Sequence, residues 1–159
     1  MQKSYIHYGN DHFDMNLFNE KKNNPRDNQF LNKPPFGFWA SPFGDEYYGW
    51  KEWCEGEEWH TDTLKKSFIF TLRPDARILT ITCNADIEPY LKRDPVFRYT
   101  NRYCVDFEKI MYKFDAMELI HGDNFEELHM IPGYFNMWDV DSIVIWNPFV
   151  ILSANKEVA

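Results

Sequence analysis

The chain has 159 residues and a formal net charge of −8, with 17 lysines and arginines against 25 aspartates and glutamates. This is the length of one ordinary domain, so a second independent core is not expected. The acidic balance argues against a nucleic-acid surface, because no run holds more than two adjacent basic residues. The sequence also contains no apolar stretch of the roughly 20 residues that a membrane crossing needs.

The spacing of the cysteines and the composition of the N-terminal residues indicate the cellular compartment. Cys54, Cys83 and Cys104 lack CxxC spacing, which argues against both a disulfide framework and a cysteine-rich zinc site. The N-terminal residues contain no apolar run typical of a signal peptide. We therefore expect the protein in the reducing cytoplasm.

Aromatic side chains are unusually frequent and make up 18% of the residues. Disordered chains are poor in aromatics, so disorder over the whole length is excluded. A chain of this composition buries large flat side chains, and some of them can serve as platforms for a ring-shaped ligand.

Runs of β-branched and aromatic residues that end at turn residues predict short strands. These strands cover residues 4–8, 36–41, 68–72, 78–83, 116–120 and 142–146. Because Pro74 and Asp75 form a turn between the third and fourth strands, we expect those two strands to be antiparallel neighbours.

Helices are predicted where apolar residues recur at helical spacing or follow a capping residue. The predicted helices cover residues 45–59, 85–92 after the cap Asn84, and 107–114 after the cap Asp106. The Asn- and Lys-rich segment 19–35 reads as a long polar loop inside one domain of residues 1–159. The sum is a mixed α+β domain with a few short helices.

Two tryptophans are candidates for the walls of a ligand site. Trp39 and Ser41 alternate with Phe38 and Ala40 on the second strand, so they share one face. Trp50 follows on the next helix, and Gly37 would let a ligand approach the strand backbone. Two such rings could hold a flat heterocycle between them, although tryptophan is also a common core residue.

His7 lies in the middle of the first strand and is followed by Tyr8 and Gly9. A neutral imidazole donates one hydrogen bond and accepts another, which suits a pair of ribose hydroxyls. The alternative is a histidine whose bonds serve the structure alone.

Asp139 and Asp141 precede the strand at 142–146. Alternation would place both carboxylates on the same side at the mouth of a buried strand, where they could stabilise a developing cation or take a proton. The alternative is a pair of solvated acids. His121, Asp123 and His129 match no strong ligand spacing, so no metal site is predicted.

Taken in chain order, these residues resemble the ADP-ribosyltransferase superfamily, and its diphtheria-toxin and poly(ADP-ribose) polymerase branch above all. That branch carries His, Tyr and Glu on three separated strands. His7 in YIHYGN matches the first-strand His, Trp39 in GFWASP stands at the strand Tyr, and Trp50 stands where a second Tyr stacks on nicotinamide.

The C-terminal stretches FDAMEL and DSIVIWNPFVI are similar to the ending common in bacterial and phage members. Asp141 then falls on the catalytic Glu of the family, and Asp139 falls two residues before it. Two departures stand out: Trp39 lacks the hydroxyl of the usual Tyr, and Asp141 is one methylene shorter than Glu.

The resemblance implies an α+β fold with ADP-ribosyltransferase-like split mixed β-sheets, and a mono-ADP-ribosyltransferase that uses NAD as its substrate. Asp141 would stabilise the cationic ribose, and Asp139 would engage a guanidinium on the acceptor. The partner would be a protein with a basic region, and the chain a toxin-like effector of a bacterium or phage. NAD would be held by His7, Tyr8, Gly9, Trp39, Ser41 and Trp50, with Lys33 close to a phosphate.

Two alternatives to transfer stay open at the level of sequence. The first is a binding or inhibitory protein that retains the transferase-like fold without catalysis, which the two departures favour. The second is an NAD glycohydrolase that uses water as the acceptor.

Overall fold

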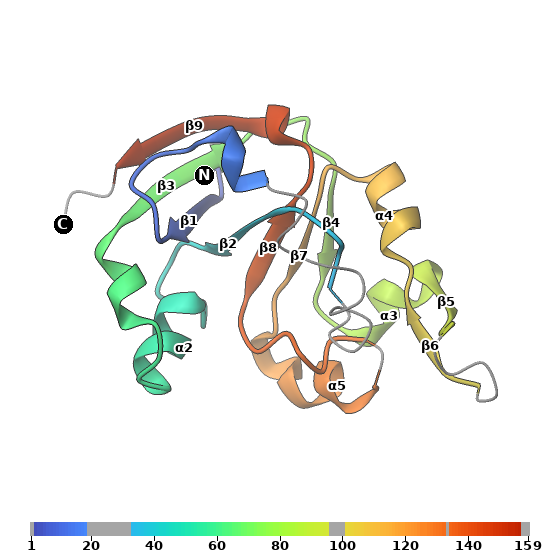
Figure 1. Cartoon of the computed structure of the whole chain (residues 1–159). Helices are drawn as coiled ribbons and strands as arrows, with labels where there is room; N and C mark the ends of the chain where they lie inside the picture. The colour runs from blue at the N-terminus through green and yellow to red at the C-terminus, as the bar shows by residue number, and fades with distance from the viewer. Residues whose placement is uncertain (1, 19–32, 96–100, 133, 157–159) are drawn as a thin grey trace.

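A computed structural model describes residues 2–18, 33–95, 101–132 and 134–156. The described residues fold into an α+β structure with one mixed seven-stranded sheet and four short α-helices, which confirms the predicted α+β class (Figure 1). The strands are β1 (Ser4–Tyr8), β2 (Phe38–Pro42), β3 (Ser67–Leu72), β4 (Ile78–Ile81), β5 (Leu91–Arg93), β6 (Tyr103–Val105), β7 (Ala116–Leu119), β8 (Ser142–Ile145) and β9 (Ile151–Lys156). The helices are α2 (Trp50–Gly56), α3 (Asn84–Ile87), α4 (Phe107–Lys113) and α5 (Phe125–Met130).

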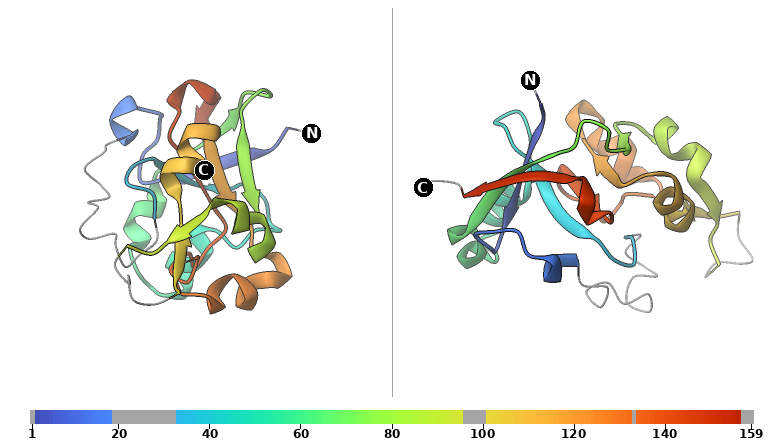
Figure 2. Two further views of the ribbon diagram at one scale, coloured as in Figure 1. Left: turned by 90° about the vertical axis from the view of Figure 1, so that its right-hand side faces the viewer. Right: turned by 90° about the horizontal axis from the view of Figure 1, so that it is seen from above.

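The strand order in the large sheet is β4-β7-β8-β2-β1-β3-β9, and β5 and β6 form a separate two-stranded pair. Only β4 and β7 run parallel; the other neighbours in the sheet are antiparallel. Helices α3 and α4 gather with the β5–β6 pair at the β4 end, away from β9 (Figures 1 and 2).

Strand β2 joins the two halves of the sheet. Its first part pairs with β8, where Phe38 lies opposite Ile145, and its last part pairs with β1, where Ser41 lies opposite Ile6. The pairing of β2 changes partner along its length, so β1 and β8 flank different parts of the same short strand. This arrangement brings residues from the start, the first third and the end of the chain side by side.

Two buried clusters stabilise the sheet. The first packs against α3, α4 and α5 and contains Met117, Leu119 and Val144 among others. The second contains Tyr5, Phe38, Phe68, Phe70, Ile143 and Ile145. Val144 and Ile143 alternate between the clusters, as neighbours on a strand must, so β8 has an apolar side chain on each face.

The structure corrects several sequence expectations. The strands at 68–72 and 78–83 are not neighbours: β3 pairs with β1 and β9, while β4 pairs with β7. The turn residues between them predicted a hairpin, but the phenylalanines of β3 are buried in the second cluster beside those of β1 and β2. Long-range burial therefore overrides the local turn signal.

The helices are also shorter than predicted. The helix expected over 45–59 covers Trp50–Gly56 only, and the one expected over 85–92 ends at Ile87 before a short 3-10 turn and strand β5. Helix α4 begins after the predicted cap Asp106, whose carboxylate accepts from the Lys109 amide. Most of the predicted loop 19–35 lies outside the described residues. None of the helices in the described part of the chain combines the length and the apolar character of a bilayer crossing.

Replacing Phe70 with alanine should lower the free energy of unfolding by about 3–5 kcal/mol, because a large core ring is lost. Phe70 is 1% exposed and contacts the rings of Tyr5, Phe38 and Phe68. Urea unfolding followed by circular dichroism measures the change. The control is Tyr112→Ala, since Tyr112 is 87% exposed and its loss should leave stability within about 0.5 kcal/mol. Equal midpoints for the two variants would contradict this packing.

Candidate functional site

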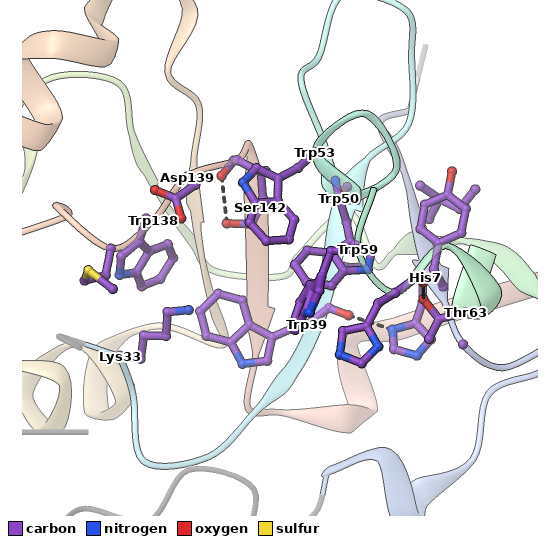
Figure 3. A pocket seen from close by; sticks show the side chains of 18 residues that line it. His7, Lys33, Trp39, Trp50, Trp53, Trp59, Thr63, Trp138, Asp139 and Ser142 are labelled. Atoms are coloured by element: carbon purple, nitrogen blue, oxygen red, sulfur yellow. Dashed lines mark hydrogen bonds between the residues drawn. The ribbon is translucent and has the colours of Figure 1, made fainter. Parts of the chain in front are cut away.

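A cavity of about 660 Å³ opens where β1, β2 and the segment before β8 meet helix α2 (Figure 3). This volume lies within the range of sites for small molecules and cofactors. Its lining comes from five separate parts of the chain: Ile6–Gly9, Lys33, Trp39–Ser41, the stretch from Trp50 to Thr63, and the stretch from Met137 to Ser142.

Tryptophan dominates the walls. Five of the six tryptophans line the cavity: Trp39, Trp50, Trp53, Trp59 and Trp138. The Trp39 ring lies 4.9 Å from that of Trp138, measured between centroids, and Trp50 stacks on Trp53 at 5.2 Å. Trp59 meets Trp50 and Trp53 edge-on. Each of these five rings therefore packs against another ring of the set.

Ser41 determines where the Trp50 wall stands. It is buried, and its hydroxyl oxygen accepts a hydrogen bond from the Trp50 amide at 2.9 Å. The Glu52 carboxylate accepts from the Gly49 amide at 2.9 Å, so the first turn of α2 is capped from within. The predicted nicotinamide contact Ser41 thus lines the cavity while it anchors helix α2 to β2.

His7 occupies the place where the pairing of β1 with β2 ends. Its Nδ1 lies 2.7 Å from the Trp39 carbonyl oxygen, which can only accept, so Nδ1 carries the proton and donates. Nε2 then accepts from the Asn10 amide group at 3.3 Å. The imidazole packs on Phe38 and Phe68, and Tyr8 and Gly9 line the cavity beside it. Gly9 has a φ of +105°, which favours glycine at this turn.

Lys33 and Asp139 place charge inside an otherwise aromatic wall. The Lys33 ammonium lies 5.6 Å from the centroid of the Trp39 ring. Burial lowers the pKa of Lys33, and the negative charge of Asp139 acts against that shift. Asp139 is exposed and lines the cavity together with Ser142.

Asp141 differs from Asp139 in burial and in hydrogen bonding. It is 4% exposed and is not among the residues that line the cavity. Its Oδ1 accepts from the His121 amide at 2.7 Å and lies 2.9 Å from His121 Nδ1, and its Oδ2 accepts from the Tyr48 amide at 3.1 Å. The Asp141 amide in turn donates to the Tyr48 carbonyl at 2.8 Å. The expectation that both carboxylates share one side is wrong, because the two residues precede β8 and do not follow strand alternation.

The contacts of Asp141 also determine its charge. Burial by itself raises the pKa of this carboxyl, but hydrogen bonds from His121 and Tyr48 outweigh burial and hold the pKa below its usual value. Asp141 is therefore ionised at neutral pH and fully engaged by its neighbours. The role of catalytic carboxylate, which the resemblance assigns to Asp141, has no support from these contacts.

His121 contacts Asp141 through Nδ1 and His129 through Nε2. The Nε2 atoms of the two histidines are 3.1 Å apart and their ring centroids 5.2 Å apart, so the imidazoles point almost directly at one another, as in an N–H···N hydrogen bond. Both Nε2 atoms also lie 2.8 Å from the Trp138 carbonyl. Burial lowers the pKa of His129. In the described residues no group of three or more His, Cys, Asp or Glu side chains could hold a metal ion.

Gly37 serves a different purpose from the one expected. A side chain there would meet the Val144 methyl at 2.5 Å, so the missing Cβ admits strand β8 rather than a ligand. Sequence reasoning also missed Trp53, Trp59 and Trp138 as wall residues. Trp50 and Trp53 are three residues apart and so share one helix face, and this spacing could have identified Trp53.

No protein-family model, curated protein or solved structure matches this chain.

Asp141→Asn should lower the free energy of unfolding at pH 7 by about 2–3 kcal/mol, because the amide nitrogen would face a backbone donor. Since the folded pKa of Asp141 is depressed, its contribution to stability is present above about pH 4 and is lost as the pH falls through the folded value. The difference in the free energy of unfolding between Asp141→Asn and the parent should therefore become smaller below about pH 4. Urea unfolding at pH 7 and at pH 3 measures it.

The matched control is Asp123→Asn, because Asp123 is exposed. The free energy of unfolding of Asp123→Asn should equal that of the parent at both pH values. A parent and an Asp141→Asn variant of equal stability at pH 7 would show that the buried hydrogen bonds contribute nothing.

Proposed function

We propose that the chain binds NAD in the tryptophan-lined cavity and acts as a mono-ADP-ribosyltransferase on a protein side chain. The observation that carries this proposal is a convergence: His7 from β1, Trp39 from β2, Trp50 from α2 and Asp139 from the segment before β8 line one cavity. The resemblance requires a strand His, a strand ring and an acid on three separated strands, and here β8, β2 and β1 are consecutive neighbours.

The walls suit the nicotinamide end of NAD. In the oxidised cofactor this ring is planar and positively charged, so indole faces attract it both by stacking and by cation–π interaction. Stacking contributes on the order of 1 kcal/mol per ring, and a cation over an indole contributes a similar amount. Trp39 and Trp50 supply the faces, and Trp138 and Trp53 pack against them.

The reaction breaks the bond between nicotinamide and C1′ of the ribose, and the electron pair leaves with nicotinamide. The ribose passes through an oxocarbenium-like state whose positive charge a nearby carboxylate stabilises. Asp139 is the carboxylate that lines the cavity, so we assign this role to Asp139. An acceptor nucleophile then attacks C1′ and loses a proton. The net charge of −8 favours a basic acceptor region.

The residues on either side of Asp139, Trp138 and Asp141, are hydrogen-bonded to other parts of the chain. On one side the Trp138 carbonyl lies 2.8 Å from the Nε2 atoms of His121 and His129. On the other side Asp141 is bound to His121 and Tyr48. Asp141 thus acts as a positioning residue for the segment that carries Asp139.

A second function is favoured by the engaged state of Asp141: a protein that binds NAD but does not transfer ADP-ribose. The acid at the position of the family's Glu is buried and fully hydrogen-bonded, so such a protein would use the cavity for recognition alone. A glycohydrolase that passes ADP-ribose to water is the third possibility.

The test combines calorimetry with NAD, a nicotinamide-release assay and transfer of labelled ADP-ribose to proteins of a cell lysate. Trp39→Ala should weaken NAD binding about tenfold, through loss of one ring face. Asp139→Asn should bind NAD but release nicotinamide about 10²–10³ times more slowly, because the charge that stabilises the transition state is gone. Asp123→Asn, outside the cavity, is the control and should match the parent.

Each alternative gives its own result. Binding without nicotinamide release identifies the recognition protein, and release without a labelled protein identifies the glycohydrolase. If calorimetry detects no heat with NAD and Trp39→Ala changes nothing, the proposal is wrong.

A further inference from the structure

Among the lysines in the described residues, Lys33 is the one whose side chain lines the cavity. The ammonium lies 5.6 Å from the centre of the Trp39 ring, and Figure 3 shows it beside that ring. A planar ring stacked on Trp39 would lie about 3.5 Å from the indole face. The bound nicotinamide ribose and the Lys33 amine would therefore be immediate neighbours.

The burial of Lys33 in the cavity wall favours the neutral, nucleophilic form of its amine. Burial disfavours the ammonium form and lowers the pKa of Lys33, as in lysines that act as catalytic amines. The negative charge of Asp139 acts against this shift, so the two groups interact, and the ammonium gives up its proton to solvent before attack. By contrast, Lys3 is paired with Glu118 at 2.8 Å, and Lys109 donates to the Pro89 carbonyl at 2.8 Å.

We propose that Lys33 is a modification site, at which the chain transfers ADP-ribose to its own Nζ. This inference rests on the proposed transferase function and names an acceptor for it. Four rotatable bonds let the Lys33 amine reach the roughly 3–3.5 Å approach that attack on C1′ needs, without movement of the cavity walls.

The step balances without a further reactant. The neutral Nζ forms a bond to C1′, the bond from C1′ to the nicotinamide nitrogen breaks, and nicotinamide leaves with the electron pair as a neutral molecule. The nitrogen of Lys33 then loses a proton to water. The product is a secondary amine that carries ADP-ribose inside the cavity.

Self-modification at this position would be self-limiting. The attached ADP-ribose would occupy the cavity beside Trp39 and exclude a second NAD. One chain would therefore accept one ADP-ribose at Lys33, and NAD binding would be lost as the modification proceeds.

The experiment incubates the full chain with NAD and measures nicotinamide release, the intact mass and the peptide map in the same sample. One ADP-ribose per chain on the peptide that contains Lys33 is the expected result. Lys33→Arg keeps a cation over Trp39 but offers a guanidinium that stays protonated, so the label on that peptide should be lost. The matched control is Lys109→Arg, because the Lys109 ammonium lies 5.7 Å from the Tyr90 ring but outside the cavity; its label should equal that of the parent.

A parallel sample with free ADP-ribose in place of NAD tests for simple glycation. Equal labelling of Lys33 by free ADP-ribose would overturn the proposal. Nicotinamide release with the label on other residues, or on none, would overturn the Lys33 assignment while NAD cleavage stands. An absence of both NAD binding and nicotinamide release would overturn the transferase function and this inference with it.

Discussion

The hydrogen bonds of the Asp141 carboxylate hold together the parts on which the cavity depends. One oxygen binds the turn before α2 through Tyr48, and the other binds the end of β7 through His121. These contacts join the tryptophan-bearing helix to the central strands. A buried, ionised aspartate of this kind is stable only because every bond it requires is present, so its neighbours are constrained in turn.

The cavity that results is unusual in its chemistry. Its faces are indoles packed against one another, and two charged side chains line it, the exposed Asp139 and the half-buried Lys33. Such a site favours a flat, positively charged ring with a polar group attached. In the proposed reaction Asp139 would stabilise the ribose cation, and the amine of Lys33 would attack it. NAD binding, transfer and self-modification are therefore connected proposals.

Local pattern explains most elements but not their partners. The strands at 4–8, 116–120 and 142–146 and the helix after Asp106 follow from β-branched runs and a capping residue, and the structure has them within a residue or so. The neighbours of β3 and β4 do not follow from the turn between them, since the phenylalanines of β3 join a cluster built from β1 and β2. Strand β9 was not predicted at all, because its partner β3 lies far earlier in the chain: Leu72 pairs with Ile151 and Phe68 with Lys156.

The sequence alone determined the class of fold, the prominence of tryptophan, and the candidate wall residues Trp39, Trp50 and His7, because composition and periodicity are local properties. Only the tertiary structure decided which acid faces the cavity. Asp139 and Asp141 are two residues apart and chemically identical, and the sequence cannot distinguish them. Burial and hydrogen-bond donors from residues 20 and 93 positions away engage Asp141, while Asp139 stays in the cavity wall.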